Sequence, residues 1–186
     1  IADATGGVDD IGLRSNANLI FTSGGSTERL RITDDGNVGV GTVTPTTQSG
    51  KVFHLHAGAA QQRFHMTNST TGASSTDGFE ILIDQETNPN CRIRNFEAGD
   101  MAFDTGGSNN EVMRITSGGQ LLIGTTDAGH SSADDLTINN SGNGGITIRT
   151  GTTSNGAIFF ADGTSGDARY DGFVQYNHGA SPYMMF

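Results

Sequence analysis

Glu28–Thr42 reads ERLRITDDGNVGVGT, and the same pattern returns at Glu111–Thr125 as EVMRITSGGQLLIGT. Arg31 matches Arg114 and Gly41 matches Gly124, and every matched pair is separated by the same offset along the chain. A pattern that recurs at a fixed spacing indicates a chain built from copies of one structural unit. The repeated stretch therefore decides the organisation of the whole sequence.

Each copy of this stretch predicts a β-hairpin. In the first copy, Leu30–Ile32 and Asn37–Val40 are short runs of strand-forming residues on either side of Asp34-Asp35-Gly36. Asp initiates turns through its side-chain oxygen, and Gly supplies a positive φ without steric cost. The second copy places Met113–Ile115 and 121–123 around a Ser-Gly-Gly turn. The two turns differ in sequence but keep their final Gly, so the backbone conformation is the repeated feature.

Further strands are expected along the chain because short apolar alternations are separated by Gly, Ser, Asn or Pro. The best helix candidate, 57–63, is too short to be stable alone. The expected strands lie at 11–13, 18–21, 52–56, 63–67, 79–83, 92–94, 101–103, 136–138, 145–148, 157–160, 172–176 and 183–186.

The repeat predicts three consecutive parts. Residues 1–46 form the end of one unit, 47–129 a complete unit, and 130–186 the start of a third. We expect the sequence to be a fragment of a longer protein for this reason.

Composition excludes several classes of function. The net charge is −10, and no cluster of Lys and Arg suggests nucleic-acid binding. The single Cys91 excludes an intrachain disulfide. No apolar run is long enough to span a membrane. Hydrophobic residues make up 33% and Gly 28 of 186 residues, so a chain of this kind needs other chains to complete its core.

The order of these motifs resembles the shaft repeats of bacteriophage tail fibres. The resemblance rests on a Gly-rich turn, Glu28–Ile32, an Asp-Gly turn, Val38–Thr42 and a nearby Pro45, and on the ending formed by Gly172–Tyr176 and Tyr183–Phe186. Such repeats commonly precede a C-terminal chaperone domain that cleaves itself off. The resemblance implies an all-β, elongated fibre shaft, an intertwined parallel homotrimer of short β-strands and hairpins.

The low apolar content also favours a trimer. A thin β structure with few apolar residues leaves sheet edges and apolar faces exposed, and three chains around one axis can cover both. The candidate residues for an axial core are Ile32, Val38, Val40, Ile115, Leu121 and Ile123.

Charged pairs recur in both units, Glu28 with Arg31 and Glu111 with Arg114. Positions three apart on a regular strand point to opposite faces. We therefore expect each member to form a structural ion pair with a partner elsewhere, with contact to a receptor as the alternative.

His54 and His56 are two apart on an expected strand and so share a face. In a trimer they would bring six imidazoles together, enough for an octahedral metal ion, whereas the simpler interpretation is two ordinary strand histidines. The Asp34-Asp35 and Asp134-Asp135 pairs lack the spacing of a calcium loop and fit turns better. No cofactor is expected.

No nucleophile–base set or phosphate loop is present, so no enzymatic activity is expected. The sequence favours a structural, rigid trimeric spacer in an extracellular virion tail fibre, which carries receptor-binding elements for attachment to a host cell. Its expected partners are itself, other virion tail proteins, and a host surface glycan or protein receptor. The alternatives are a carbohydrate-binding or glycan-degrading tailspike module, with Phe159, Phe160, Tyr170 and Tyr176 as its aromatic cluster, and a bacterial surface adhesin with similar repeats.

Overall fold

The structure is a computed structural model, and it describes residues 13, 15–47, 49–58, 60–107, 109–179 and 181–186. These residues form short strands, and their only helix is a single 3₁₀ turn, η1 (Gly166–Arg169). The all-β class predicted from sequence is confirmed. Two residues of the expected strand 11–13 lie outside the described residues.

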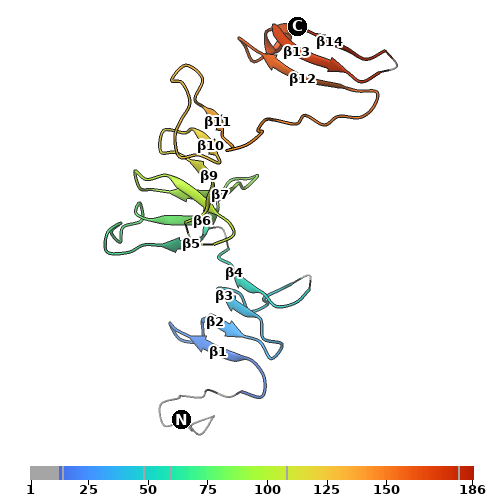
Figure 1. Cartoon of the computed structure of the whole chain (residues 1–186). Coiled ribbons are helices and arrows are strands. Elements are labelled where there is room, and N and C mark those ends of the chain that lie inside the picture. The colour runs from blue at the N-terminus through green and yellow to red at the C-terminus, as the bar shows by residue number, and fades with distance from the viewer. Residues whose placement is uncertain (1–12, 14, 48, 59, 108, 180) are drawn as a thin grey trace. The chain divides into compact units, whose positions relative to one another are not determined.

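The chain divides between Asp100 and Met101 into two compact units. Each unit contains a four-stranded sheet followed by a three-stranded sheet (Figure 1). The sequence repeat suggested boundaries after residues 46 and 129. The structural boundary after Asp100 falls at another point within the repeated pattern.

The four-stranded sheets share one topology. In the first unit the sheet consists of β1 (Leu19–Thr22), β2 (Glu28–Ile32), β3 (Val38–Val40) and β4 (Phe53–Leu55). In the second unit it consists of β8 (Met101–Asp104), β9 (Glu111–Ile115), β10 (Leu121–Ile123) and β11 (Leu136–Ile138). The first three strands of each sheet are antiparallel, and the fourth pairs in parallel with the third. The predicted hairpins are therefore confirmed as β2–β3 and β9–β10.

The three-stranded sheets are antiparallel meanders. They consist of β5 (Gln62–Met66), β6 (Phe79–Ile83) and β7 (Cys91–Asn95), and of β12 (Asn155–Phe160), β13 (Gly172–Asn177) and β14 (Tyr183–Met185). The repeat in the sequence relates β14 to β8, yet β14 pairs with β13 and takes the topological place of β7.

The helix signal at 57–63 was too short for a stable helix, and the described residues of this stretch form none; Gln62 and Arg63 begin β5. One local expectation is wrong. Residues 145–148 form no strand, although their sequence alternates as a strand does.

Gly41 and Gly124 end β3 and β10 at a point where backbones converge. Their φ angles are +74° and +69°, and their amides donate to the carbonyls of Arg29 and Val112. A Cβ at position 41 would overlap the carbonyl oxygen of His56, and one at position 124 would overlap that of Asn139. Glycine at this point lets the parallel fourth strand approach.

Replacing Gly124 by alanine is expected to destabilise the second unit more than replacing Gly119. Both residues have positive φ, but a Cβ at Gly119 meets open space. The left-handed conformation costs alanine about 1–2 kcal/mol at either site, so the overlap with Asn139 adds to that cost only at position 124. Denaturant unfolding of the two variants measures the difference, and equal losses would contradict the close approach.

Candidate association surface

Each four-stranded sheet has one face built wholly from apolar side chains. Cross-strand registers place eight such residues on one side of each sheet. In the first sheet they are Leu19, Phe21, Leu30, Ile32, Val38, Val40, Phe53 and Leu55. In the second they are Met101, Phe103, Met113, Ile115, Leu121, Ile123, Leu136 and Ile138.

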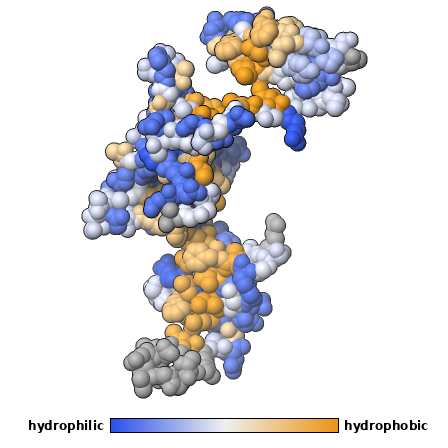
Figure 2. Space-filling model, in the orientation of Figure 1, coloured by the Kyte–Doolittle hydropathy of each residue, from blue (hydrophilic) through white to orange (hydrophobic). Residues whose placement is uncertain are grey.

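None of these side chains is buried within the chain. Phe53 is 63% exposed and Leu136 48%, and Figure 2 shows hydrophobic residues gathered over β1–β4. The six residues predicted to form an axial core all lie on these two faces, as their spacing suggested. The chain itself leaves them at least partly open to solvent.

One face of the sheet β5–β7 is also largely apolar, with Gln62 and Asn95 at its opposite corners. Phe64, Ile81 and Ile93 lie side by side across its three strands and are 56%, 48% and 58% exposed. Met66, Phe79 and Ile83 belong to the same face. This apolar side also carries the exposed Cys91.

The opposite faces of the four-stranded sheets are covered by the chain itself. In the first unit the connection from β3 to β4 folds back over Gly39, where an added Cβ would lie 3.0 Å from the Thr42 oxygen and 3.3 Å from the Pro45 ring. In the second unit the same side holds Leu122, which is 1% exposed. Each sheet is therefore closed on one side and open on its apolar side.

His54 anchors this connection. The Thr46 amide donates to His54 Nδ1 at 3.3 Å. At the equivalent place in the second unit, the Gly129 amide donates to Thr137 Oγ1 at 2.9 Å. The two acceptors occupy matching positions in β4 and β11, so a histidine ring and a threonine hydroxyl perform the same structural task in the two units.

Replacing His54 by threonine is expected to preserve the stability of the first unit, while alanine at that position is expected to lower it by about 1 kcal/mol through loss of the hydrogen bond. Thermal unfolding of both variants measures the effect. If threonine proved as damaging as alanine, the anchoring role would be wrong.

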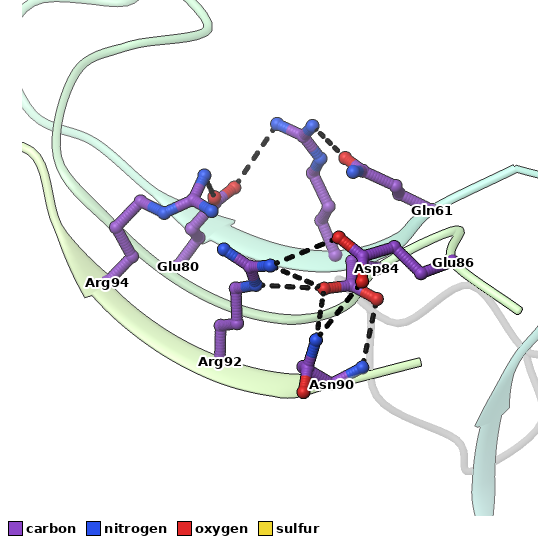
Figure 3. Close-up of polar contacts among 8 residues, drawn as sticks. Gln61, Glu80, Asp84, Glu86, Asn90, Arg92 and Arg94 are labelled. Carbon is purple, nitrogen blue, oxygen red and sulfur yellow. Dashed lines mark hydrogen bonds and ion pairs between the residues drawn. The ribbon is translucent and has the colours of Figure 1, made fainter. Parts of the chain in front are cut away.

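The polar face of β5–β7 encloses a carboxylate. Glu80 is 0% exposed and lies between Arg94, whose Nη1 donates to Oε1 at 2.7 Å, and Arg63, whose Nη1 donates to Oε2 at 3.3 Å. Figure 3 shows the guanidinium group of Arg94 directed at this carboxylate. The first unit therefore buries a charge in its own interior and leaves an apolar face outside, the reverse of the usual arrangement in a monomeric protein.

A second carboxylate closes the β6–β7 loop. Asp84 accepts from the Asn90 amide at 2.9 Å and from Arg92 Nε at 2.9 Å, and Glu86 lies 3.6 Å from the same guanidinium (Figure 3). These contacts fix the charged end of the sheet.

The repeated Glu and Arg form ion pairs, as predicted, but within each unit they bind one another, whereas partners elsewhere had been expected. Arg31 Nε and Nη2 donate to the two oxygens of Glu28 at 2.7 and 2.6 Å, and Arg114 binds Glu111 in the same way. A β-bulge is the reason. Thr22 pairs with Glu28 while Phe21 pairs with Leu30, so one extra residue shifts the alternation and brings glutamate and arginine to the same face.

The acidic residues in these contacts predict loss of stability in acid. The hydrogen bonds from Arg31 lower the pKa of Glu28 below its ordinary 4.5, and the Asn90 amide chiefly lowers the pKa of Asp84 below 3.8. Both pKa values are lower in the folded chain than in the unfolded chain, so the unfolded chain binds more protons as the pH falls. The stability that these carboxylates contribute is therefore present above pH 4.5 and is lost as the pH falls below it.

Urea unfolding between pH 7 and 3 measures this dependence. The midpoint is expected to be nearly constant down to pH 5 and then to fall. Glu28→Gln is expected to be less stable at pH 7 and to have a shallower dependence on acid; an unchanged dependence would contradict the role of the pair.

The histidines do not support a metal site on the apolar side. His54 lies on the covered face with Arg31 and Gly39, and its ring centroid is 5.9 Å from that of His56. Within the described residues, no group of three or more His, Cys, Asp or Glu side chains could hold a metal ion. Asp34 and Asp35 occupy the β2–β3 turn, while Asp134 accepts from Gln120 at 2.6 Å.

The candidate aromatic cluster is divided. Phe159 contacts Tyr170 and Phe173 with ring centroids 6.3 Å apart in each case, whereas Phe160 and Tyr176 lie on the other face of β12–β13 by register. The four rings therefore form no single platform for a sugar.

Comparisons with known proteins found no relative of this chain. No family model matches the chain, and no curated protein matches it as a relative. Among the described residues, no helix has the length and apolar character needed to cross a membrane.

Proposed function

We propose that the chain forms part of the shaft of a bacteriophage tail fibre, a rigid trimeric spacer that carries receptor-binding elements for adsorption to the host. The observation that supports this most strongly is the open apolar face of the four-stranded sheet, present in both units at equivalent positions. Large exposed apolar patches commonly mark surfaces where proteins associate, and this one recurs in both units.

Association of copies would explain why the chain buries the Glu80 carboxylate and leaves the apolar faces of its sheets exposed. Covering one large apolar side chain contributes about 1.5–3 kcal/mol, and each face offers eight such side chains. The buried Glu80 and the covered connections fix the other side of each sheet, so the apolar side alone needs a partner.

The role that follows is mechanical. Repeated units set the length of the shaft, and the contacts between copies supply stiffness and slow unfolding. The partners of such a shaft are its own copies, other proteins of the virion tail and, through its receptor-binding elements, a host surface glycan or protein.

Light scattering on the native protein tests the association, and a mass of three chains is the expected result. A stable monomer at micromolar concentration would overturn the shaft proposal. A chelator is expected to leave the mass unchanged, because the histidines serve as structural residues here.

Immunolabelling tests the location. Antibodies raised against this chain are expected to decorate fibres in electron micrographs of the phage. Labelling of a bacterial cell surface in the absence of phage would instead favour an adhesin.

A further inference from the structure

The stretch Gly145–Arg149, GITIR, has the sequence of a strand and no strand partner. Ile146 and Ile148 alternate with polar residues and are 66% and 45% exposed. Among the described residues, no hydrogen bond joins the backbone of 145–149 to another residue. Figure 1 draws this part of the connection between β11 and β12 without an arrow.

The side chain that follows this stretch also lacks a partner. Thr150 Oγ1 is shielded from solvent and makes no hydrogen bond with a described residue. Unpaired polar groups of this kind cost free energy unless something satisfies them. The whole stretch 145–150 is therefore incomplete in a single chain.

The strand β12 has one unpaired edge nearby. It pairs with β13 alone, so the other side of Asn155–Phe160 carries free backbone groups. Stable monomers usually protect such an edge with a charge, a proline or a bulge. The sequence NGAIFF contains no charge and no proline, and its register with β13 is regular.

The repeat shows what the counterpart of GITIR does in the other unit. The offset that relates the two hairpins matches this stretch with Gln62–Met66, which is β5, and β5 pairs antiparallel with β6 at the edge of its sheet. The stretch at this repeat position is thus an edge strand in the first unit and unpaired in the second, where β12 takes the topological place of β5.

A chain does not supply this strand to its own edge. Ile148 and Thr150 pass over the face of β12, because a Cβ added at Gly156 would lie 3.5 Å from Ile148 Cγ2 and 3.7 Å from Thr150 Oγ1. The turn that follows, closed by the Ser154 amide on the Gly151 carbonyl at 3.0 Å, holds the stretch there. The lateral edge stays open.

We infer that residues 145–149 of one copy pair as a β-strand with the open edge of β12 in a neighbouring copy. The inference rests on the proposed association of copies and adds its mechanism in the second unit. Addition of a strand to a sheet edge satisfies the backbone of both partners, and repeated around a symmetry axis it closes into a ring without a free edge.

Hydrogen exchange on the native protein tests the pairing. The amides of residues 146–149 are expected to exchange about 100-fold more slowly in the assembly than in the monomeric Ile81→Asp variant, whose substitution lies in the first unit. An assembly of the expected mass with unprotected amides at 146–149 would overturn the strand exchange and leave the shaft proposal intact. A native protein that is monomeric would overturn the shaft proposal itself.

Crosslinking separates exchange between copies from pairing within one chain. In a Cys91→Ser background, chains carrying Thr147→Cys are assembled with chains carrying Ala157→Cys, and mild oxidation is expected to give a disulfide-linked dimer of the two kinds. A single chain carrying both substitutions provides the control. If oxidation of that chain yields only an internally closed monomer, the strand pairs with its own copy and the inference is wrong.

Discussion

Replacing Ile81 by aspartate is expected to give a chain that folds but no longer assembles. Ile81 lies at the centre of the apolar face of β5–β7, between Phe64 and Ile93, and is already 48% exposed in one chain. A carboxylate there costs the single chain little. Burying it against another copy without a partner costs several kcal/mol, so association is expected to weaken by about 1,000-fold or more. Light scattering measures the mass across a dilution series.

Ser75→Asp is the matched control. It adds the same charge to the same unit at an exposed loop position, and it is expected to leave the mass unchanged. An Ile81→Asp protein with the mass of the native assembly would show that this face remains uncovered and would remove the main support for the shaft.

Replacing Glu80 by alanine is expected to be the most damaging single change within one chain. The side chains of Arg63 and Arg94, which are 38% and 35% exposed, would lose the buried carboxylate that they share. Both guanidinium groups keep contact with solvent, so the loss of their charged hydrogen bonds is expected to cost about 1–3 kcal/mol. Chemical denaturation measures the loss in the free energy of unfolding.

Glu86→Ala is the matched control for that experiment. The Glu86 side chain is 63% exposed and lies 3.6 Å from Arg92, so its loss is expected to change stability by no more than about 1 kcal/mol. Equal effects of the two substitutions would mean that Glu80 contributes no more than a surface charge.

The sequence was sufficient to predict the class of the fold, the hairpins and the side of each strand that is apolar. These features follow from local patterns. The final Gly of the β2–β3 turn has φ +80°, and that of the β9–β10 turn has φ +89°, as their positions in the turns required. Period-two alternation placed Val38 and Val40 on one face, where the register finds them.

Features that depend on a break in regularity could not be predicted. One extra residue in the bulge beside Thr22 turns Glu28 towards Arg31, and no local pattern marks that residue. The role of His54 depends on a connection that folds back over the sheet, so only its equivalence with Thr137 gave a signal. Residues 145–148 carry a strand pattern, yet no strand in the described part of the chain pairs with them.

The likeness of the two apolar faces has a consequence for how copies align. A copy displaced by one whole unit would set β1–β4 of one chain against β8–β11 of another, with apolar side chains still meeting apolar side chains. The three-stranded sheets differ more, because β12–β14 pairs Gln175 with Ala157 on one face and Val174 with Ile158 on the other, whereas β5–β7 has Phe64, Ile81 and Ile93 in one row across its three strands. The three-stranded sheets therefore distinguish a correct alignment from a displaced one, and substitutions that make β12–β14 resemble β5–β7 are expected to permit staggered assemblies.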